Sequence, residues 1–253
     1  MDFQKVTAVA TRRGIFQPAF DAYGGLAGFY DYGPVGVRMR RRILEVWRKH
    51  YIIDAGCLEL DGALIGPETL FQASGHLGEF DDALVDCPDC GKQFRADHLV
   101  DDGDALTRED LAEAVSKTAC PNCGAELSEL KAFNLMFSTG IGSGRGAQGY
   151  LRPETAQNIF LAFPWLLRQN RGKLPFAGAQ IGRAFRNEIS PRQGPLRMRE
   201  FTQMEVEHFF LPGDEPGLSD SLKNVNITLV PAKGKKTTTT IGKAFSSGTL
   251  GSS

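Results

Sequence analysis

Arginines and carboxylates recur at short spacing in one stretch of this chain. Phe185-Arg186-Asn187-Glu188 comes first, and Arg197-Met198-Arg199-Glu200-Phe201 and Glu205-Val206-Glu207 follow it. A guanidinium can place two N–H groups on one pair of phosphate oxygens, and a neighbouring carboxylate can accept from an amine. The pattern therefore favours a site for a nucleotide phosphate beside an amino-acid ammonium. An isolated Arg–Glu pair on a strand is more often a surface salt bridge, but here the pattern repeats across a loop and after Arg152-Pro153-Glu154.

Two cysteine pairs indicate a second kind of chemistry. Cys87-Pro-Asp-Cys90-Gly and Cys120-Pro-Asn-Cys123-Gly each have the form of a metal-binding knuckle. Together they supply four thiolates, which predicts a structural zinc site with no position left for water. A chance pair of reduced motifs and a redox C-x-x-C are the alternatives. His98 is a possible substitute ligand that a four-cysteine site does not need, and Cys57 is expected to be a buried apolar residue.

Composition and charge set limits on the class of protein. The chain has 253 residues and a hydrophobic content of 42%, which is typical of a globular protein of one large domain or one domain with an insert. A net charge of −1 excludes a chain-wide basic footprint for nucleic acid, so any such contact must be local. Lys5, Arg12 and Arg13 interrupt the apolar run that a secretory signal peptide would need at the N-terminus. No apolar run is long enough for a membrane span. We expect a cytoplasmic protein without a membrane partner.

The elements that must position these residues follow from hydrophobic periodicity and from breaks in it. The run of arginines and lysines in the helix after Gly33-Pro34 indicates, on its pattern alone, a helix face exposed to solvent. The expected elements, in chain order, are a short helix and a hairpin or loop within residues 1–33, a helix from Val35 to Tyr51, a strand at Leu58–Leu60, a helix capped by Thr107, a strand-like Phe133–Phe137, a helix from Glu154 to Asn170, two antiparallel strands at Ala177–Arg186 and Arg199–Phe210, and a weak strand at Asn224–Val230.

Changes in composition divide the chain into four segments. We expect a first part of a catalytic core over residues 1–81 and an inserted zinc-knuckle module over 82–132. A second part of the core covers 133–212, and a partial insertion or poorly ordered tail covers 213–253. The tail is rich in Lys, Thr, Ser and Gly, so it buries little.

With these residues in view, the chain resembles the N-terminal, catalytic part of a glycyl-tRNA synthetase of the dimeric class II type, in its archaeal and eukaryotic form. The matching segments follow the family's order over about residues 14–212. They are Gly28–Gly36, Ser74-Gly75-His76, Phe94–His98, Phe133–Phe137, Tyr150–Gln157, Gly172–Phe176, Phe185–Arg192, Arg199–Thr202 and Glu205–Phe209.

The resemblance implies an α+β fold, in which an antiparallel sheet is flanked by helices and carries a small inserted zinc-ribbon module. The helix after Pro34 resembles motif 1, which implies a homodimer through that helix. The strands around 177–210 resemble motif 2. By this similarity Arg186 binds the ATP α-phosphate and Glu188 the adenine amino group, and these two are the catalytic residues. The remaining implied roles are adenine stacking for Phe201, contacts to phosphates or the tRNA acceptor end for Arg192, Arg197 and Arg199, and the glycine pocket for Arg152, Glu154 and Glu205.

The implied reaction is glycine–tRNA ligation. The glycine carboxylate attacks the α-phosphate of ATP and releases pyrophosphate, and the adenylate then passes glycine to the 3′ end of tRNA(Gly) and releases AMP. Mg²⁺ would neutralise charge on the ATP phosphates. No side-chain nucleophile is required, because positioning and charge stabilisation carry the chemistry. Carboxylates that hold the ammonium and leave no room for a β-carbon select glycine without an editing domain.

The chain departs from the family pattern after Pro212. No third motif with a G-x-G-x-x-R pattern follows, and Thr240–Ala244 only weakly resembles a family insertion. We therefore expect an incomplete catalytic chain. The alternative is a non-catalytic fragment or paralogue that binds tRNA or a partner subunit. A zinc-ribbon nucleic-acid module unrelated to aminoacylation remains only if the motif 2 match is accidental.

Overall fold

The computed structural model of the chain describes residues 3–143, 146–189, 191, 194–214, 220–230 and 235–246. The described chain forms two compact units, Met1–Phe209 and Phe210–Ser253. Each unit is considered by itself.

A three-stranded sheet forms the centre of the larger unit, with the strand order β11-β10-β3. The long strands β10 (Phe176–Phe185) and β11 (Glu200–Phe209) are antiparallel, with Gln180 opposite Glu205 and Phe185 opposite Glu200. This confirms the predicted strand pair. The short strand β3 (Leu58–Leu60), also predicted, runs parallel to β10 with Leu60 opposite Gln180.

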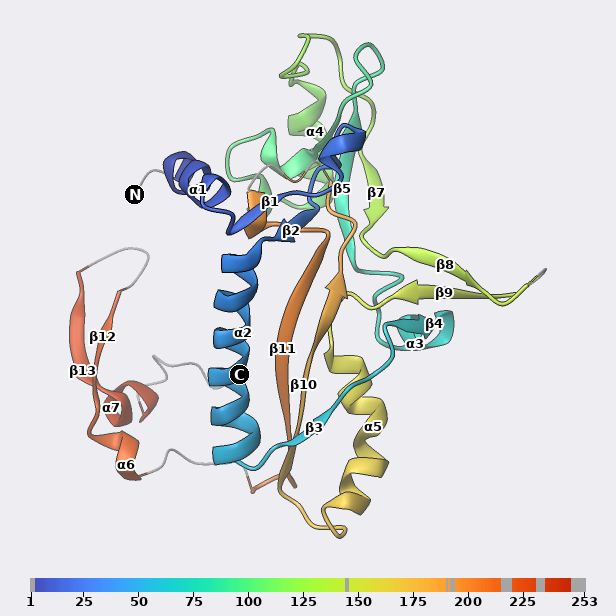
Figure 1. The fold of residues 1–253 in the computed structure, drawn as a ribbon. Coiled ribbons are helices and arrows are strands. Elements are labelled where there is room, and N and C mark those ends of the chain that lie inside the picture. Colours follow the sequence, from blue (N-terminus) through green and yellow to red (C-terminus); the bar gives the residue numbers. More distant parts are fainter. Residues whose placement is uncertain are drawn as a thin grey trace. The chain divides into compact units, whose positions relative to one another are not determined.

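Helices cover both faces of this sheet, which confirms the predicted α+β class (Figure 1). Helix α2 (Pro34–Arg48) continues as a π-helical turn (Lys49–Asp54), and Trp47, Tyr51 and Ile52 pack with Ala177 and Ala179. Helix α5 (Ala156–Gln169) packs Ile159 and Leu166 with Phe176. Because side chains alternate along a strand, odd-numbered residues of β10 face α2 and even-numbered residues face α5.

Two smaller sheets flank the N-terminal and middle parts of this unit. The predicted short helix is α1 (Phe3–Arg12). It precedes β1 (Phe16–Pro18), which pairs with β2 (Tyr30–Tyr32), so the hairpin is present rather than the alternative loop. The second sheet was not predicted. In it β9 (Ala147–Leu151) lies between β8 (Ser138–Ile141) and β4 (Ile65–Pro67), and α3 (Glu68–Ala73) follows β4. Single 3-10 turns occupy Asp21–Tyr23 and Gly194–Leu196.

The segment with the cysteine pairs has its own sheet and its own core. Strand β5 (Asp81–Asp86) lies between β6 (Gln93–Arg95) and β7 (Lys131–Asn134). Helix α4 (Arg108–Ser116) packs Leu111 and Val115 with Val85 and Phe94, and 3-10 turns occupy Ala96–His98 and Gly103–Ala105. The predicted cap is present, because Thr107 accepts from the Asp110 N–H at 3.2 Å.

The smaller unit pairs β12 (Asn226–Leu229) with β13 (Thr237–Thr240) between the short helices α6 (Asp220–Lys223) and α7 (Ile241–Ser246). The strand near Asn224–Val230 was predicted, whereas the strand of four threonines was not. Among the helices that the structure describes, none is both long and apolar enough to cross a membrane.

Candidate functional site

The α5-facing side of β10 and β11 brings several of the predicted residues together. Gln203, Glu205 and Glu207 alternate along β11 and therefore share one face. The first turn of α5 starts beside them, because Thr155 is its N-cap residue and contacts Glu205. Arg186 directly follows β10, so that strand carries it to the same region.

Arg186 lies between a carboxylate and two aromatic rings. Its Nε donates to the Pro153 carbonyl at 3.1 Å, and its Nη2 lies 4.0 Å from Glu154 Oε2. The guanidinium carbon is 5.3 Å from the centre of the Phe80 ring and 5.6 Å from that of Phe201. These contacts fix the plane of the guanidinium and leave N–H groups for an anion.

Two predicted pocket carboxylates are held by neighbours that the sequence pattern did not indicate. Glu205 Oε2 accepts from the Thr155 N–H at 2.7 Å and from the Thr155 hydroxyl, and Glu205 Oε1 accepts from Gln203 Nε2 at 2.7 Å. Glu154 Oε1 accepts from Gln157 Nε2 at 2.6 Å and lies 3.6 Å from His76 Nε2.

A third carboxylate adds negative charge to this group. Glu207 follows Glu205 on the same face of β11. Burial raises the pKa of Glu207, and the charges of Glu205 and Glu154 raise it further. Gln203, Glu205 and Glu207 are two residues apart in a predicted strand, and this spacing could have shown from the sequence that their side chains lie on the same face.

Arg152 is buried against this face, next to Gln180 and Gly182 of β10, with only 2% of its surface exposed. Its Nε donates to the Arg183 carbonyl at 2.8 Å, and its Nη1 donates to the Gly62 carbonyl at 3.0 Å. Gln180 lies against the same guanidinium and, with its side-chain oxygen toward Nη2, accepts at 3.2 Å. Burial lowers the pKa of Arg152, and Asp61 and Glu205 oppose that effect. The guanidinium therefore joins strand and loop carbonyls, and its contact with a bound amino acid stays a prediction.

The residues after β10 form a second cluster around Glu188. The Glu188 carbonyl accepts from Arg199 Nε at 3.1 Å and Nη2 at 2.7 Å, while Arg199 Nη1 donates to the Ala27 carbonyl at 2.8 Å. Arg199 thus joins the N-terminal loop to the loop after β10, and burial lowers its pKa. The Glu188 carboxylate lies 3.7 Å from Arg197 Nε, and its buried Oε2 has no hydrogen-bond donor among the described residues. Arg192 lies outside the described residues.

The four predicted metal-ligating cysteines converge. Their sulfurs lie within 4.8 Å of one another, with 3.4 Å between Cys87 and Cys123 and 3.8 Å between Cys90 and Cys120. Thiolates about 2.3 Å from a tetrahedral zinc are about 3.8 Å apart, so the sulfur positions fit that ion. His98 is not part of this group and lies 4.0 Å from Asp97. Cys57 is buried, as predicted.

Both knuckles have the same backbone geometry. The Cys87 N–H donates to the Lys92 carbonyl and the Cys120 N–H to the Ala125 carbonyl, and each knuckle glycine donates back to its first cysteine. Gly91 and Gly124 have φ values of 67° and 80°, which favour glycine. The Lys92 backbone N–H, together with hydrogen bonds from Cys87, Cys123 and Asn122, lowers the pKa of Cys90 to about 6. Such hydrogen bonding favours the thiolate that a metal binds. Against a hydrogen bond from the Ala125 backbone, the neighbouring thiols raise the pKa of Cys123 to about 12, because one proton is shared within the cluster.

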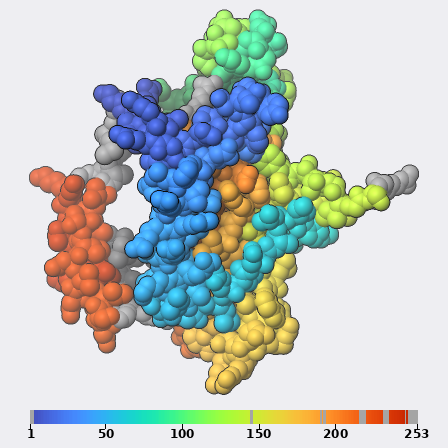
Figure 2. Space-filling model, in the orientation of Figure 1, coloured from blue at the N-terminus to red at the C-terminus, as the bar shows by residue number. Residues whose placement is uncertain are grey.

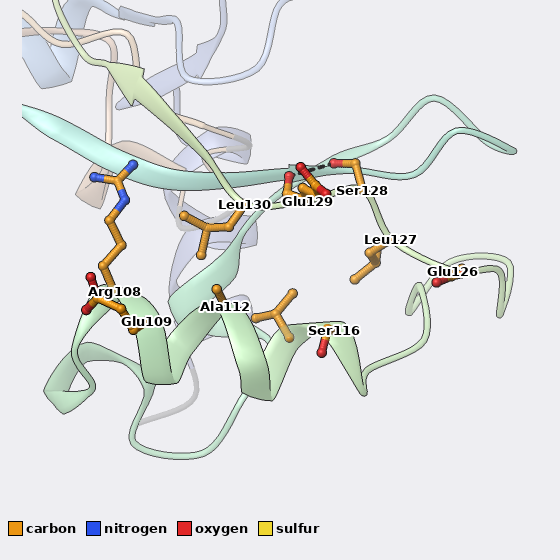
Figure 3. A pocket seen from close by; sticks show the side chains of 10 residues that line it. Arg108, Glu109, Ala112, Ser116, Glu126, Leu127, Ser128, Glu129 and Leu130 are labelled. Carbon is orange, nitrogen blue, oxygen red and sulfur yellow. Dashed lines mark hydrogen bonds between the residues drawn. The ribbon is translucent and has the colours of Figure 1, made fainter.

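The larger of two hollows on the described surface does not coincide with the clusters of predicted site residues. A hollow of about 470 Å³ lies between α4 and residues 126–130, and no predicted site residue lines it (Figure 3). A smaller one of about 170 Å³ is lined by His76 and Phe80, which contact Glu154 and Arg186, together with Ser74, Gly75 and Glu79. Charge and hydrogen bonding, rather than volume, therefore define the candidate site.

The sequence of the chain is similar to that of a known protein family and of individual proteins. Residues 143–230 match the family model of the tRNA synthetase class II core domain (G, H, P, S and T). The chain is 51% identical over 216 residues to glycine–tRNA ligase from Methanothrix thermoacetophila, which covers 83% of this chain and 37% of that protein. It is 45% identical over 239 residues to glycine–tRNA ligase from Methanocaldococcus jannaschii, which covers 91% of this chain and 41% of that protein. The chain thus spans about two fifths of the length of these relatives.

A solved structure supports the fold. The RNA binding domain of threonyl-tRNA synthetase from Cryptosporidium parvum Iowa II superposes with a TM-score of 0.51 at 17% identity. The superposition covers 81% of this chain and 37% of that chain. At this identity the similarity concerns the fold alone.

Proposed function

We propose a function from the premise that the chain belongs to the glycine–tRNA ligase family and carries a class II tRNA synthetase core domain. In this proposal it forms the region that activates glycine with MgATP and presents the adenylate to the 3′ end of tRNA(Gly). The observation that carries the proposal is the convergence of Arg186 with Glu154 and Glu205 on one face of the sheet.

The charges of this face match the two substrates. The carboxylates of Glu154 and Glu205 suit an ammonium group, and Arg186 beside Glu154 suits the carboxylate–phosphate junction where the reaction takes place. A fixed guanidinium stabilises the negative charge that develops on the α-phosphoryl oxygens. Positioning by these groups therefore supplies the chemistry without a side-chain nucleophile.

The adenine end of ATP fits the second cluster. Glu188 Oε2 is a buried acceptor that receives no hydrogen bond from the described residues, since Arg197 Nε lies 3.7 Å away, and the exocyclic amine of adenine is a donor of the required kind. Phe201 presents a ring beside Arg186, on which a purine can stack. Arg197 lies next to Glu188 and is the arginine of this loop that we assign to phosphate. For Arg199, the three carbonyl contacts favour a positioning role over a contact with ATP.

Zinc is proposed as a structural ion held by Cys87, Cys90, Cys120 and Cys123. Four sulfur ligands complete a tetrahedral shell, so the ion would supply stability and no catalytic position. Its loss would weaken the packing of Cys87 and Cys120 with Leu111 and Val115 of α4.

A homodimer through α2 is also part of the proposal. The helix lies at the surface of the larger unit (Figure 2). It exposes Val35, Met39, Ile43 and Val46, which recur at helical spacing. An exposed apolar stripe of this kind is typical of a helix that packs against a partner.

The experiment that tests the function is glycine-dependent ATP–pyrophosphate exchange on the purified chain, with alanine and serine as controls. Exchange with glycine alone would support the proposal. A folded, zinc-loaded chain that supports no exchange and binds neither glycine nor ATP would contradict it and favour the non-catalytic alternative, in which the chain binds tRNA or a partner subunit.

A further inference from the structure

Thr155 makes an unusual pair of contacts for a residue at a helix start. It is fully buried, and both its N–H (at 2.7 Å) and its hydroxyl donate to the same oxygen, Oε2 of Glu205. Gln203 Nε2 donates to the other oxygen at 2.7 Å. The carboxylate of Glu205 is therefore fixed in its plane as well as in its position.

These contacts replace the capping hydrogen bond that a threonine normally makes at the start of a helix. Thr155 is the N-cap residue of α5, where a threonine hydroxyl usually accepts from an N–H of the first turn. Here its side chain makes no capping hydrogen bond. The hydroxyl instead connects α5 to β11, and the start of the helix places its positive dipole end beside a carboxylate.

The need for such an anchor comes from the charges around Glu205. Glu205 and Glu154 both act as like charges on Glu207, which shares a face of β11 with Glu205. Without donors, like-charge repulsion would favour a Glu205 side chain that turns away from its neighbours. Glu154 is held from the same short segment, since Gln157 donates to it at 2.6 Å. Residues 154–157 therefore set the spacing between the two carboxylates.

We infer that Thr155 is a positioning residue for recognition of the amino-acid ammonium, acting through Glu205. This inference rests on the proposed function, because it concerns the same pocket. Thr155 does not face the substrate. It holds the carboxylate in the one orientation in which a small ammonium can be bound between Glu205 and Glu154.

Two substitutions of Thr155 separate this role from a general effect on folding. Thr155→Val keeps the shape and the N–H but removes the hydroxyl, whereas Thr155→Ser keeps the hydroxyl. We expect Thr155→Val to raise the Kd for glycine about 10-fold or more, because a hydrogen bond to a charged group is lost. The Kd for ATP should change less than about 2-fold, and Thr155→Ser should restore glycine binding. Calorimetric titration of each chain with glycine and with MgATP measures both.

The outcomes distinguish the inference from the proposed function. Unchanged glycine affinity in Thr155→Val, or an equal loss of glycine and ATP affinity that Thr155→Ser does not restore, would overturn the inference. A wild-type chain that binds no glycine would instead contradict the proposed function. Crystal structures of the two variants then decide the positioning role: a Glu205 carboxylate reoriented in Thr155→Val but not in Thr155→Ser supports it, and an unmoved carboxylate overturns it.

Discussion

At the scale of single residues, Arg186 is the side chain on which the proposed chemistry depends most. Its guanidinium lies near Glu154 and the rings of Phe80 and Phe201. We expect Arg186→Ala to lower the rate of glycine-dependent pyrophosphate exchange about 10²–10³-fold, which is typical of removing one preorganised transition-state donor. The matched control is Arg183→Ala on the same strand, whose half-exposed pair with Glu200 is a surface contact. Equal rates in wild type and Arg186→Ala would exclude the assigned role.

Glu207 provides a prediction about pH. Its pKa is raised by burial and by Glu205 and Glu154, so its ionised form is less favourable in the folded chain than in the unfolded chain. The stability that this carboxyl contributes is present at low pH and is lost as the pH rises through its folded pKa. Glu207→Gln should therefore raise the free energy of unfolding at neutral pH by about 0.5 kcal/mol or less, because solvent screens a half-exposed group.

The gain from Glu207→Gln should vanish below the pKa of an unfolded glutamate, about 4.3. Denaturant unfolding at several pH values measures it. Glu200→Gln serves as a control, since it removes a partner of Arg183 and should give no gain. A Glu207→Gln chain that is less stable at neutral pH than wild type would contradict the charge argument.

At the scale of elements, β10 is shaped by the buried Arg152. A Cβ atom at Gly182 would lie next to Arg152 Nη2, whereas a Cβ atom at Gly140 in β8 would meet nothing within 4 Å. We expect Gly182→Ala to cost about 1–3 kcal/mol of stability, as overpacking does in well-packed interiors. Gly140→Ala should be close to neutral. Thermal unfolding of both variants checks this, and equal melting temperatures would show that Arg152 can move at little cost.

The knuckle pair gives a prediction about metal. Purified chain should contain about one zinc, and Cys120→Ser should lose it, because a four-thiolate shell becomes incomplete. Chelator or acid should also release the ion, since protons compete for the thiolates. Cys57→Ala is the control, because Cys57 lies outside the cluster and should leave the zinc content unchanged. Metal analysis that finds no zinc in freshly purified wild type would exclude the site.

The elements show how far local sequence patterns reach. The strands β10 and β11, the helices α2, α4 and α5 and the convergence of the four cysteines were predictable, because periodicity, caps and knuckle turns are local signals. The sheet of β4, β8 and β9 was not, since its glycine-rich strands carry no alternation. The parallel pairing of β3 with β10 joins residues far apart in the chain, which no local pattern encodes.

The candidate site divides in the same way. Arg186, Glu154 and Glu205 were singled out by residue type and spacing, and their ATP and glycine roles, which the resemblance implied, stay predictions. The carbonyl contacts of Arg152 and Arg199 were not predicted. The accepting carbonyls belong to Gly62 and Ala27, which are far away in the sequence, so no local pattern indicates these contacts. Thr155 was missed for a further reason: at a helix start its type predicts a cap, and only the structure reveals that Glu205 uses it instead.

At the scale of the whole molecule, the exposed stripe on α2 predicts the state of association. Val46 and Ile43 are 62% and 59% exposed on the larger unit. We expect Val46→Glu to weaken a dimer at least about 100-fold, because a charge would be buried at the interface without a partner. Leu161→Glu on α5, where the leucine is 63% exposed, is the matched control. Sedimentation equilibrium measures both, and a monomeric wild type would contradict the dimer.

The strand pair β5–β7 has a consequence for how such a chain can vary in evolution. Asp81 lies opposite Asn134 and Asp82 opposite Phe133, so the long stretch between them leaves and returns at one place. Insertions or deletions between these points need not change the register of the central sheet. The same closure affects the pairing of β3 with β10. Once β5 has paired with β7, the residues between them no longer lengthen the loop that joins β3 to β10, so they add little to the entropy cost of closing that loop.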